Sequence, residues 1–388
     1  MDLLLLLLVG LNGVALAYLG YSLYCTLRLF PFGRMGARVP ESNLPPVSII
    51  KPVAGIEEET RENFLSFCAQ DYPEFEIVFA LTDPKDPVLP LIEALQREFP
   101  ARNIRWRIVQ ENRGPNYKVG NLVGAVREAR HDLLVFNDSD MRAAPGYLRE
   151  VAAAFLPEKV GLVTCLYRSV NLHTLPAALH ALTLQTGFVP SVAVSRKTEG
   201  LSYAFGATIC TSKEVLNCFG GLETLADYLA DDYQMGYRTH RAGLRVELAP
   251  VLVDDVCGRL RFKDYLRHQL RWAVTQRVCR PGGYYASIVT HATSLSLLLL
   301  VATRFSLHAL FYFLIVCGLR IVSSHWLNRR FFRNREIGRY FWLIPFNDLL
   351  NTLIWALSLL RNTVQWRQRR FYVLAGGRMV ELGRTQAN

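Results

Sequence analysis

One segment limits what this chain can fold into more than any other: the uncharged apolar run at residues 3–24. A helix of about 20 apolar residues crosses the roughly 30 Å hydrocarbon core of a bilayer, so this run predicts a membrane-spanning helix. A cleaved signal peptide is the alternative, because Ala15-Leu16-Ala17 resembles a cleavage site. Signal peptides begin with positive charge, whereas this chain begins Met1-Asp2. We therefore expect a permanent anchor within residues 1–28.

Basic residues lie beside the apolar segments of the chain. Arginines follow the anchor at positions 28, 34 and 38, and under the positive-inside rule this order places the N-terminus outside and the next domain in the cytosol. The net charge of +11 suggests an anionic partner, which could be nucleic acid, a phosphorylated ligand or a membrane surface. Because the chain has no known nucleic-acid-binding motif, we expect the lipid bilayer as a partner and no nucleic acid.

Three further apolar stretches lie near the C-terminus. Residues 285–303 and 305–319 are separated only by Arg304, which predicts a tight membrane hairpin. The basic cluster at 328–336 then predicts a return to the cytosol. The third stretch, 340–360, is interrupted by a proline and several polar residues, and a full crossing would leave the arginines that follow it outside. We expect this stretch to be either re-entrant or interfacial.

Residues 259–280 combine apolar side chains at helical spacing with seven basic residues and one acid. This pattern predicts a basic amphipathic helix, which is typical of a membrane interface. Arg271 and Trp272 also permit another orientation, toward a bound ligand. Arginine can contact a diphosphate through two donors at once, and tryptophan can stack or pack.

The residues between 44 and 258 have a different pattern, because short β-branched runs alternate with helical stretches. The expected strands are 47–52, 76–82, 104–110, 132–138, 161–167 and 244–253, and the expected helices are 57–70, 87–99, 117–130 and 145–156. Such alternation predicts an α/β domain with a mostly parallel sheet covered on both faces. Ligands bind these sheets at the carboxyl ends of the strands, so polar residues there are candidates for a site.

Acidic residues follow two of the expected strands. Asp83 comes after the strand 76–82, and Asp138 and Asp140 form a D-x-D pair after DLLVFN. Two carboxylates at a strand end, together with phosphate oxygens and water, make an oxygen-rich site that suits Mg²⁺ or Mn²⁺. The alternative is a turn, which aspartate and serine also favour.

A second acidic pair, Asp231-Asp232, lies in LADDY, a segment that we expect to be helical. One interpretation is a pair of exposed charges on the helix surface. The other is a general base, which would take a proton from an attacking hydroxyl and whose pKa partial burial would raise.

Together these motifs resemble the GT-A glycosyltransferases, and among them the ceramide glucosyltransferase family. The resemblance covers about residues 10–370, and its strength lies in the order and spacing of the motifs. These are VSIIKPVAG (47–55), QDYPEFEIV (70–78), TDPKDP (82–87), NYKVGNL (116–122), NDSD (137–140), EKVGLVT (158–164), FGAT (205–208), ADDYQMG (230–236) and HQLRW (268–272). The resemblance implies a Rossmann-like GT-A catalytic domain with an N-terminal transmembrane anchor and C-terminal membrane helices.

The resemblance also implies a role for each candidate site residue. Asp138 and Asp140 would hold Mg²⁺ or Mn²⁺ on the diphosphate of a UDP-sugar, and Asp232 would be the catalytic base. Arg271 and Trp272 would close over the diphosphate and the acceptor. The remaining candidates would bind the donor nucleotide, and they are Lys51, Asp83, Lys118 and Asn121, with Asp138 contributing to both sites.

Two positions depart from the family pattern. Its last motif usually has Gln or Arg three residues before the Arg-Trp pair, where this chain has His268 followed by Gln269, so either side chain could substitute there. Vertebrate-type ceramide enzymes have a histidine in the acceptor-side loop, where this chain has Phe188. The bacterial members that glycosylate hopanoids look closer, which favours bacteriohopanetetrol over ceramide as the acceptor.

The resulting prediction is a membrane-bound inverting enzyme that moves one glucose or N-acetylglucosamine from a UDP-sugar to a lipid hydroxyl. Its catalytic domain would face the cytosol at a bacterial inner membrane. A processive polysaccharide synthase, a polyprenyl-phosphate sugar transferase and a non-enzymatic membrane scaffold are the alternatives. The expected parts are an anchor (1–28), a catalytic domain (44–258), an interfacial helix (259–283) and a C-terminal membrane region with a basic tail (284–388).

Overall fold

The computed structural model describes residues 3–29, 39–109, 114–366 and 369–382. Some expectations from the sequence fall outside these ranges. They concern Met1, Asp2, Arg34, Arg38 and Gln110, the last of which ends an expected strand.

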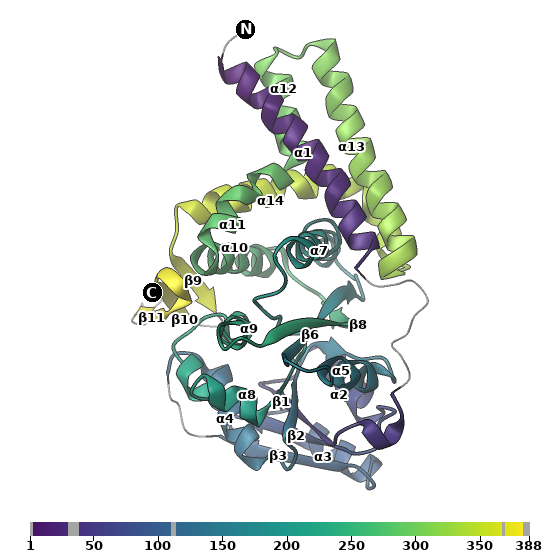
Figure 1. Ribbon diagram of the computed structural model, residues 1–388, viewed down its shortest axis with the longest axis vertical. Helices are drawn as coiled ribbons and strands as arrows, with labels where there is room; N and C mark the ends of the chain where they lie inside the picture. Colours follow the sequence, from purple (N-terminus) through teal and green to yellow (C-terminus); the bar gives the residue numbers. More distant parts are fainter. Residues whose placement is uncertain (1–2, 30–38, 110–113, 367–368, 383–388) are drawn as a thin grey trace.

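Three long apolar helices project from one end of the molecule (Figure 1). They are α1 (Leu3–Leu27), α12 (Ala292–Ala302) and α13 (Leu307–Leu327). The side chain of Asn12 in α1 donates a hydrogen bond to the carbonyl of Leu295 in α12 (3.1 Å), and the Tyr312 hydroxyl of α13 donates to the Asn12 carbonyl (3.2 Å). The three helices therefore form one small bundle, held partly by polar contacts between otherwise apolar surfaces.

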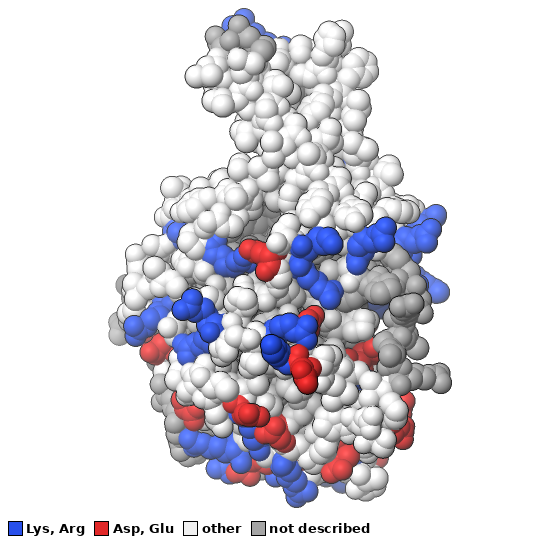
Figure 2. All heavy atoms as spheres, in the orientation of Figure 1, with Lys and Arg blue, Asp and Glu red and all other residues white. Residues whose placement is uncertain are grey.

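The helices of this bundle match the expected anchor and hairpin. Leu3–Leu27 and Leu307–Phe332 are each long and apolar enough to cross a membrane, and so are Pro281–Thr290 and Ala292–Ala302 if that bent pair is one span. The second arm of the hairpin is longer than expected, since α13 continues past residue 319 to Leu327. Figure 2 shows the projecting helices almost without charge, whereas Lys and Arg side chains gather where they join the rest of the protein.

A further apolar helix was not expected from the sequence. Residues 175–198 form α6 (Leu175–Thr183), a π segment (Leu184–Phe188) and α7 (Val189–Thr198). The stretch is also apolar and long enough to span a membrane, but 72% of its most apolar window is buried inside the protein. A helix that is apolar on all sides is either buried or in a membrane, and here the rest of the chain covers it.

The centre of the molecule is an eight-stranded sheet with the order β3-β2-β1-β4-β7-β6-β8-β5. Its strands are β1 (Val47–Pro52), β2 (Phe75–Leu81), β3 (Asn103–Ile108), β4 (Leu133–Phe136), β5 (Met141–Arg142), β6 (Val160–Val170), β7 (Ile209–Ser212) and β8 (Arg245–Val256). Strands β1 to β4 pair in parallel, as do β6 and β8, whereas β7 and β5 pair antiparallel with their neighbours. The expected mostly parallel α/β fold is confirmed, and all six expected strands are present.

Helices cover the sheet because its central strands are apolar on both faces. Every residue of β2, FEIVFAL, is buried, which is the pattern of a strand between two layers of helices. The covering helices include α2 (Thr60–Cys68), α3 (Leu89–Glu98), α4 (Tyr117–Glu128), α5 (Tyr147–Phe155), α8 (Lys213–Cys218) and α9 (Asp231–Arg241). The main hydrophobic core lies between these helices and the strands.

Between the sheet domain and the projecting bundle lie α10 (Phe262–Cys279), the short α11 (Pro281–Ala286) and α14 (Ile344–Leu359), which run across the base of the bundle (Figure 1). The amphipathic helix expected at 259–280 is α10, which packs against α14, α6 and β9. The stretch 340–360 contains α14, whose 16 residues are too few for the candidate spans. Its transverse position fits the interfacial alternative.

The C-terminal segment forms a small sheet, which the sequence analysis did not predict. It consists of β9 (Thr363–Trp366), β10 (Arg369–Val373) and β11 (Met379–Leu382). Its backbone bonds to the segment before α9, because Leu229 N donates to the Gly377 carbonyl (3.0 Å) and Met379 N to the Asp227 carbonyl (2.7 Å). The expected basic tail is therefore partly a folded unit that is attached beside α9 and α10.

Candidate active site

Carboxylates from two distant segments meet around one lysine at the carboxyl ends of the strands. Lys118 Nζ, in the first turn of α4, lies 2.7 Å from Asp138 Oδ1 and 3.4 Å from Asp231 Oδ2. Asp138 follows β4, and Asp231 begins α9. Burial by itself would lower the pKa of Lys118, but Asp138, Asp231 and Asp232 outweigh it and raise that pKa. Lys118 is thus a fixed positive charge that links the NDSD and ADDY motifs.

Asn116 explains why α4 and the ADDY segment lie together. Its side-chain oxygen accepts a hydrogen bond from Val119 N (3.2 Å), which makes Asn116 the N-cap of α4. Its amide nitrogen donates to the Tyr228 carbonyl (2.8 Å) and lies 3.4 Å from Asp231 Oδ1. One asparagine therefore starts the helix that carries Lys118 and fixes the segment that carries both acids of ADDY.

Asp232 is held by two backbone donors. Gly206 N donates to Asp232 Oδ2 (2.9 Å), and Tyr233 N donates to Oδ1 (2.8 Å). Burial, followed by the nearby Asp231 charge, raises the pKa of Asp232 to about 6, although Lys118 opposes that rise. A carboxylate with this pKa is ionised at neutral pH and still basic enough to accept a proton.

Gly206, in the FGAT motif, connects the two acidic motifs at close range. A Cβ atom at this position would lie 2.7 Å from Asp138 Oδ2, so no larger residue fits without displacing that carboxylate. The glycine is required because its backbone N–H must reach Asp232 while the Asp138 side chain passes over it.

Asp140 has an unpaired oxygen. Its Oδ1 atom is buried and has no hydrogen-bond partner among the residues that the structure describes. Burial, followed by the charges of Asp255 and Asp138, raises the pKa of Asp140 well above its ordinary value. A buried, unpartnered oxygen beside a second carboxylate is what a divalent cation would compensate. The Asp138 and Asp140 side chains therefore fit the expected Mg²⁺ or Mn²⁺ ion.

Lys51 lies behind this group, rather than at its surface. Its side chain is fully buried, Nζ donates to the Asp138 carbonyl (3.1 Å), and the ammonium lies 3.6 Å from the ring centre of Phe67. Burial lowers the pKa of Lys51 to about 7. Its contacts support the backbone of the NDSD motif, and so any effect on a bound nucleotide would be indirect.

Asp83 and Asn121 lie at a different part of the sheet edge. Asp83 is exposed after β2, where its Oδ1 accepts a hydrogen bond from Lys85 N (2.8 Å). Asn121, on α4, accepts a hydrogen bond from the Thr82 hydroxyl (3.0 Å) and is largely buried. Because the Asp83 side chain is exposed, a ligand hydroxyl or ring N–H can reach it.

The predicted residues of α10 do not all face the same way. Arg271 lies 6.0 Å from the ring centre of Trp366, and partial burial lowers the pKa of its guanidinium, although the charges of Asp232 and Asp138 oppose that decrease. His268 and Trp272 have ring centres 4.5 Å apart. Burial, with a contribution from Arg271, lowers the pKa of His268 well below its ordinary value, so this imidazole is neutral.

Gln269 points into the protein. Its Nε2 lies 2.9 Å from His180 Nδ1, and the other ring nitrogen of His180 lies 3.1 Å from Asp255 Oδ2. Ser169 donates to the same Asp255 oxygen (2.7 Å). Gln269 is only 5% exposed, so it belongs to a buried hydrogen-bond chain between α10, α6 and β8. Of the two alternatives for the diphosphate contact, His268 is the one whose ring contacts Trp272.

A known protein family matches nearly the whole of this chain. The sequence profile of glycosyl transferase family 21 matches residues 7–379. The chain belongs to glycosyl transferase family 21. The resemblance stated from the motifs is thereby confirmed at the level of the family, and this family 21 protein is a glycosyltransferase.

Several relatives of this family 21 protein are ceramide glucosyltransferases. Ceramide glucosyltransferase 1 of Caenorhabditis elegans is 23% identical over 386 residues, covering 96% of this chain and 81% of the relative. The ceramide glucosyltransferase of Gibberella zeae is 30% identical over 154 residues, 37% of this chain and 29% of the relative. An uncharacterised glycosyltransferase of Bacillus subtilis is 34% identical over 119 residues, 30% of this chain and 29% of the relative.

Two solved structures also resemble the family 21 protein. A mannosyltransferase from Pyrobaculum calidifontis, in complex with GDP-Man and Mn²⁺, aligns over 89% of this chain and 99% of its own, with 17% identity and a TM-score of 0.48. TarS of S. aureus in complex with UDP-GlcNAc aligns over 88% of this chain and 98% of its own, with 15% identity and a TM-score of 0.39.

Sequence reasoning missed one part of this family 21 site and named another only through the family resemblance. The guanidinium of Arg369, in β10, lies 4.2 Å from the ring centre of Tyr117, the residue before Lys118. Phe188, at the end of the π segment, packs against Phe205 (4.8 Å between ring centres) and Tyr167 (5.1 Å). The cluster of arginines and aromatics at 366–372 could have indicated the first part, whereas Phe188 was named from the resemblance alone.

Proposed function

We propose that this glycosyltransferase moves one sugar from a UDP-sugar to a hydroxyl of a membrane lipid, with inversion at the anomeric carbon. The observation that carries the proposal is the group of three carboxylates, Asp138, Asp231 and Asp232, around Lys118, with Asp140 close to Asp138. Figure 1 shows α9, which begins at Asp231, on the side of the sheet domain toward α10 and the apolar bundle. A soluble donor and a membrane acceptor can meet at such a position.

The donor diphosphate would be bound from two sides. Asp138 and Asp140 would hold the divalent cation, which when bound neutralises charge on the leaving diphosphate. Arg271 would add a second positive charge from α10. The charges of Asp232 and Asp138 already act on its guanidinium. Asp83, at the end of β2, would accept a hydrogen bond from the ribose or the uracil.

The acceptor hydroxyl would be activated by Asp232. Its carboxylate takes the hydroxyl proton while the oxygen attacks the anomeric carbon and the bond to the diphosphate breaks. The backbone donors Gly206 N and Tyr233 N keep the carboxylate oriented for that transfer. A single displacement inverts the configuration, so an α-linked donor gives a β-glycoside.

The proposed acceptor is a hopanoid, bacteriohopanetetrol, with ceramide as the second candidate. The ceramide glucosyltransferases among the relatives support a lipid acceptor in general. The departures at Phe188 and His268 favour the hopanoid. We further propose that the catalytic domain faces the cytosol at a bacterial inner membrane, because arginines follow the apolar helices at positions 28, 329 and 330.

Product analysis tests this proposal directly. Membranes containing the protein are supplied with UDP-glucose or UDP-N-acetylglucosamine and with both lipids as competing acceptors, and the lipid products are identified by mass spectrometry. We expect one added hexose or N-acetylhexosamine on bacteriohopanetetrol. A polymeric product would support a processive polysaccharide synthase. A sugar on a polyprenyl phosphate would support a polyprenyl-phosphate sugar transferase.

Substitution of Asp232 tests its proposed role as the base. Asp232→Asn should preserve folding and reduce transfer at least a thousandfold, because the amide keeps the shape but cannot accept the proton. Asp227→Asn is the matched control, since that carboxylate is half exposed and pairs with Arg378 at the surface. Both variants are assayed beside the wild type, and full transfer by Asp232→Asn would exclude Asp232 as the base.

A further inference from the structure

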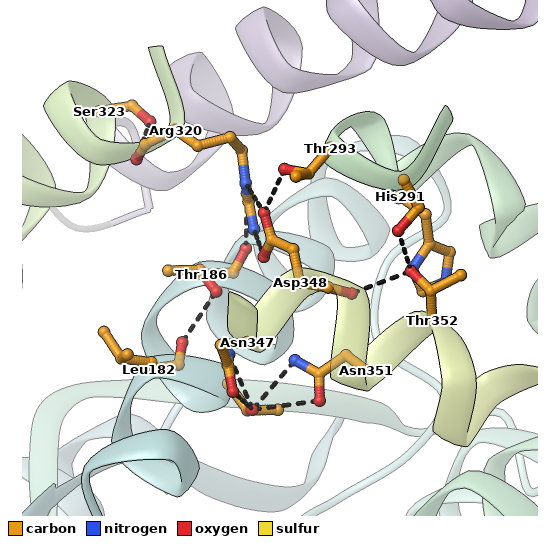
Figure 3. A network of polar contacts seen from close by, with 12 residues as sticks. Leu182, Thr186, His291, Thr293, Arg320, Ser323, Asn347, Asp348, Asn351 and Thr352 are labelled. Carbon is orange, nitrogen blue, oxygen red and sulfur yellow. Dashed lines mark hydrogen bonds and ion pairs between the residues drawn. The ribbon is translucent and has the colours of Figure 1, made fainter. Parts of the chain in front are cut away.

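A buried ion pair lies at the base of the apolar bundle (Figure 3). Arg320 of α13 donates through Nε to Asp348 Oδ2 (2.9 Å) and through Nη2 to Asp348 Oδ1 (2.6 Å), and Asp348 belongs to α14. The two side chains are only 11% and 8% exposed. Thr293 of α12 donates to the same carboxylate (2.6 Å). One acid thus joins α12, α13 and α14.

The third guanidinium nitrogen of Arg320 contacts a different element. Its Nη1 atom donates to the backbone carbonyl of Thr186 (3.1 Å), which lies in the π segment between α6 and α7. One turn further along α13, the Ser324 carbonyl accepts a hydrogen bond from the Gln185 side chain (2.8 Å). Two consecutive residues of the π segment are therefore held by one face of α13.

The π segment is also held where it begins. Thr183, at the end of α6, lies within hydrogen-bond distance of Asn347 (3.2 Å) and of Asn351 (3.1 Å), which are one turn apart on α14. Figure 3 shows these contacts beside the ion pair. The π segment is thus bonded to both helices that the ion pair connects.

The other end of the π segment reaches the candidate active site. Phe188 packs edge-to-face on Phe205, and Phe205 precedes Gly206, whose N–H holds Asp232. Phe188 also contacts the rings of Tyr167 and, more distantly, Trp272 (6.4 Å between ring centres). A continuous chain of contacts therefore runs from Arg320 through the π segment to the base.

The chemistry of the ion pair favours positioning over stabilisation. A buried ion pair often adds no net stability, because desolvation of the two charges offsets their attraction. A guanidinium, however, presents donors in a fixed plane, so it can bind a carboxylate with two and direct a third at a carbonyl. Lysine has one ammonium and cannot hold three acceptors in this arrangement. π turns are themselves frequent at functional sites.

We propose that Arg320 is a positioning residue for the acceptor side of the active site. Its pair with Asp348 fixes the π segment, residues 184–188, so that Phe188 forms a wall against which the lipid acceptor is placed. The inference rests on the proposed function, since it assumes a lipid acceptor between the bundle and Asp232. The ion pair is therefore expected to affect binding of the acceptor and to leave binding of the donor unchanged.

Two variants separate positioning from stability. Arg320→Lys keeps the charge beside Asp348 but loses the planar donors. The exchanged pair, Arg320→Asp with Asp348→Arg, keeps an ion pair between α13 and α14 but moves the guanidinium to the other helix, away from the Thr186 carbonyl. Arg329→Lys is the control, because Arg329 lies in the turn after α13 and is exposed.

Three measurements are made on each full-length variant in the same membranes. They are the KM for the lipid acceptor, the KM for the UDP-sugar, and hydrolysis of the UDP-sugar without acceptor. We expect the acceptor KM to rise at least fivefold in Arg320→Lys and in the exchanged pair, with donor KM and hydrolysis within twofold of wild type. An equal loss of transfer and hydrolysis, or full restoration of transfer by the exchanged pair, would overturn the proposal.

Hydrogen exchange of the peptide 183–190 gives a readout that does not depend on the substrate. We expect its protection to decrease in Arg320→Lys and in the exchanged pair, while peptides of β1 and β2 stay unchanged. Unchanged protection of 183–190 would contradict the positioning role. If the wild type transfers sugar to neither lipid, the proposed function fails, and hydrogen exchange still decides whether Arg320 holds the segment.

Discussion

Lys118 is one positive side chain beside three carboxylates, those of Asp138, Asp231 and Asp232. It lies against Asp138 and Asp231, whose charges it compensates. Asp232 receives less of this compensation and, with burial and the Asp231 charge, has its pKa raised to about 6. Asp232 is thereby left basic enough to accept a proton near neutral pH.

The raised pKa of Asp232 predicts the pH dependence of the reaction. A base must be deprotonated to act, so transfer requires a pH above about 6. We expect kcat/KM for the acceptor to increase about tenfold per pH unit below that value and to level off above it. The measurement covers pH 4.5 to 8 at constant ionic strength, with donor binding followed in parallel. A decrease in kcat/KM centred near pH 4, instead of near pH 6, would show that Asp232 does not control the rate.

Several site residues were predictable from the sequence because they lie at a strand end or inside a short motif. Asp138 and Asp140 follow an apolar strand, and Asp232 lies in ADDY. The sequence left His268 and Gln269 as alternatives for the diphosphate contact. It could not separate them, because the partner of Gln269, His180, is 89 residues away. The Arg320 contact to Thr186 had no local signal at all, because 134 residues separate the two positions.

At the scale of elements, the small sheet β9–β11 acts as a clamp on the active site. Phe371, Val373 and Met379 pack with Leu229 and Val274, which join the sheet to the segment before α9 and to α10. Gln234 of α9 also donates to the Gly376 carbonyl (3.1 Å). The sheet therefore connects the helix that carries Asp232 with the helix that carries Arg271.

Loss of this packing should release the clamp. Phe371 is 1% exposed, and Phe371→Ala removes a buried ring, which typically costs about 3–5 kcal/mol. We expect trypsin to cleave the C-terminal segment at least tenfold faster in this variant and transfer to decrease in parallel. Tyr372→Ala is the matched control, because Tyr372 is adjacent but 38% exposed. Equal cleavage rates in the two variants would argue against the clamp.

At the scale of the whole molecule, the apolar bundle and the sheet domain occupy opposite ends, with α10, α11 and α14 between them (Figure 1). The start of α1 and the turn at Arg304 lie together at the far end of the bundle. The native Cys218 is exposed on the sheet domain. If the bundle spans the membrane, these two regions are on opposite sides of it.

Thiol labelling tests this arrangement in intact cells. An impermeant maleimide should label Arg304→Cys, introduced in a Cys218→Ser background, from outside the cell. The native Cys218 should react only after the membrane is opened, because we propose that the sheet domain is cytosolic. Labelling of Cys218 in intact cells, or protection of position 304, would reverse the proposed orientation.

The sequence by itself determined the local elements and their chemistry. Alternating apolar strands and helices predicted the α/β fold, an uncharged run of 22 residues predicted α1, and the motifs placed the acids at strand ends. These features depend on neighbours in the chain, whose spacing is fixed by the period of a helix or a strand. The family assignment followed from the same motifs.

Only the tertiary structure decided which apolar segments are covered by protein and which distant side chains meet. Hydropathy does not distinguish residues 175–198, which are mostly buried inside the molecule, from a membrane span. The contacts of Lys118 with Asp138, of Gln269 with His180, and of Arg320 with Thr186 all join separate elements. They form because packing brings those elements together, and no local pattern encodes that proximity.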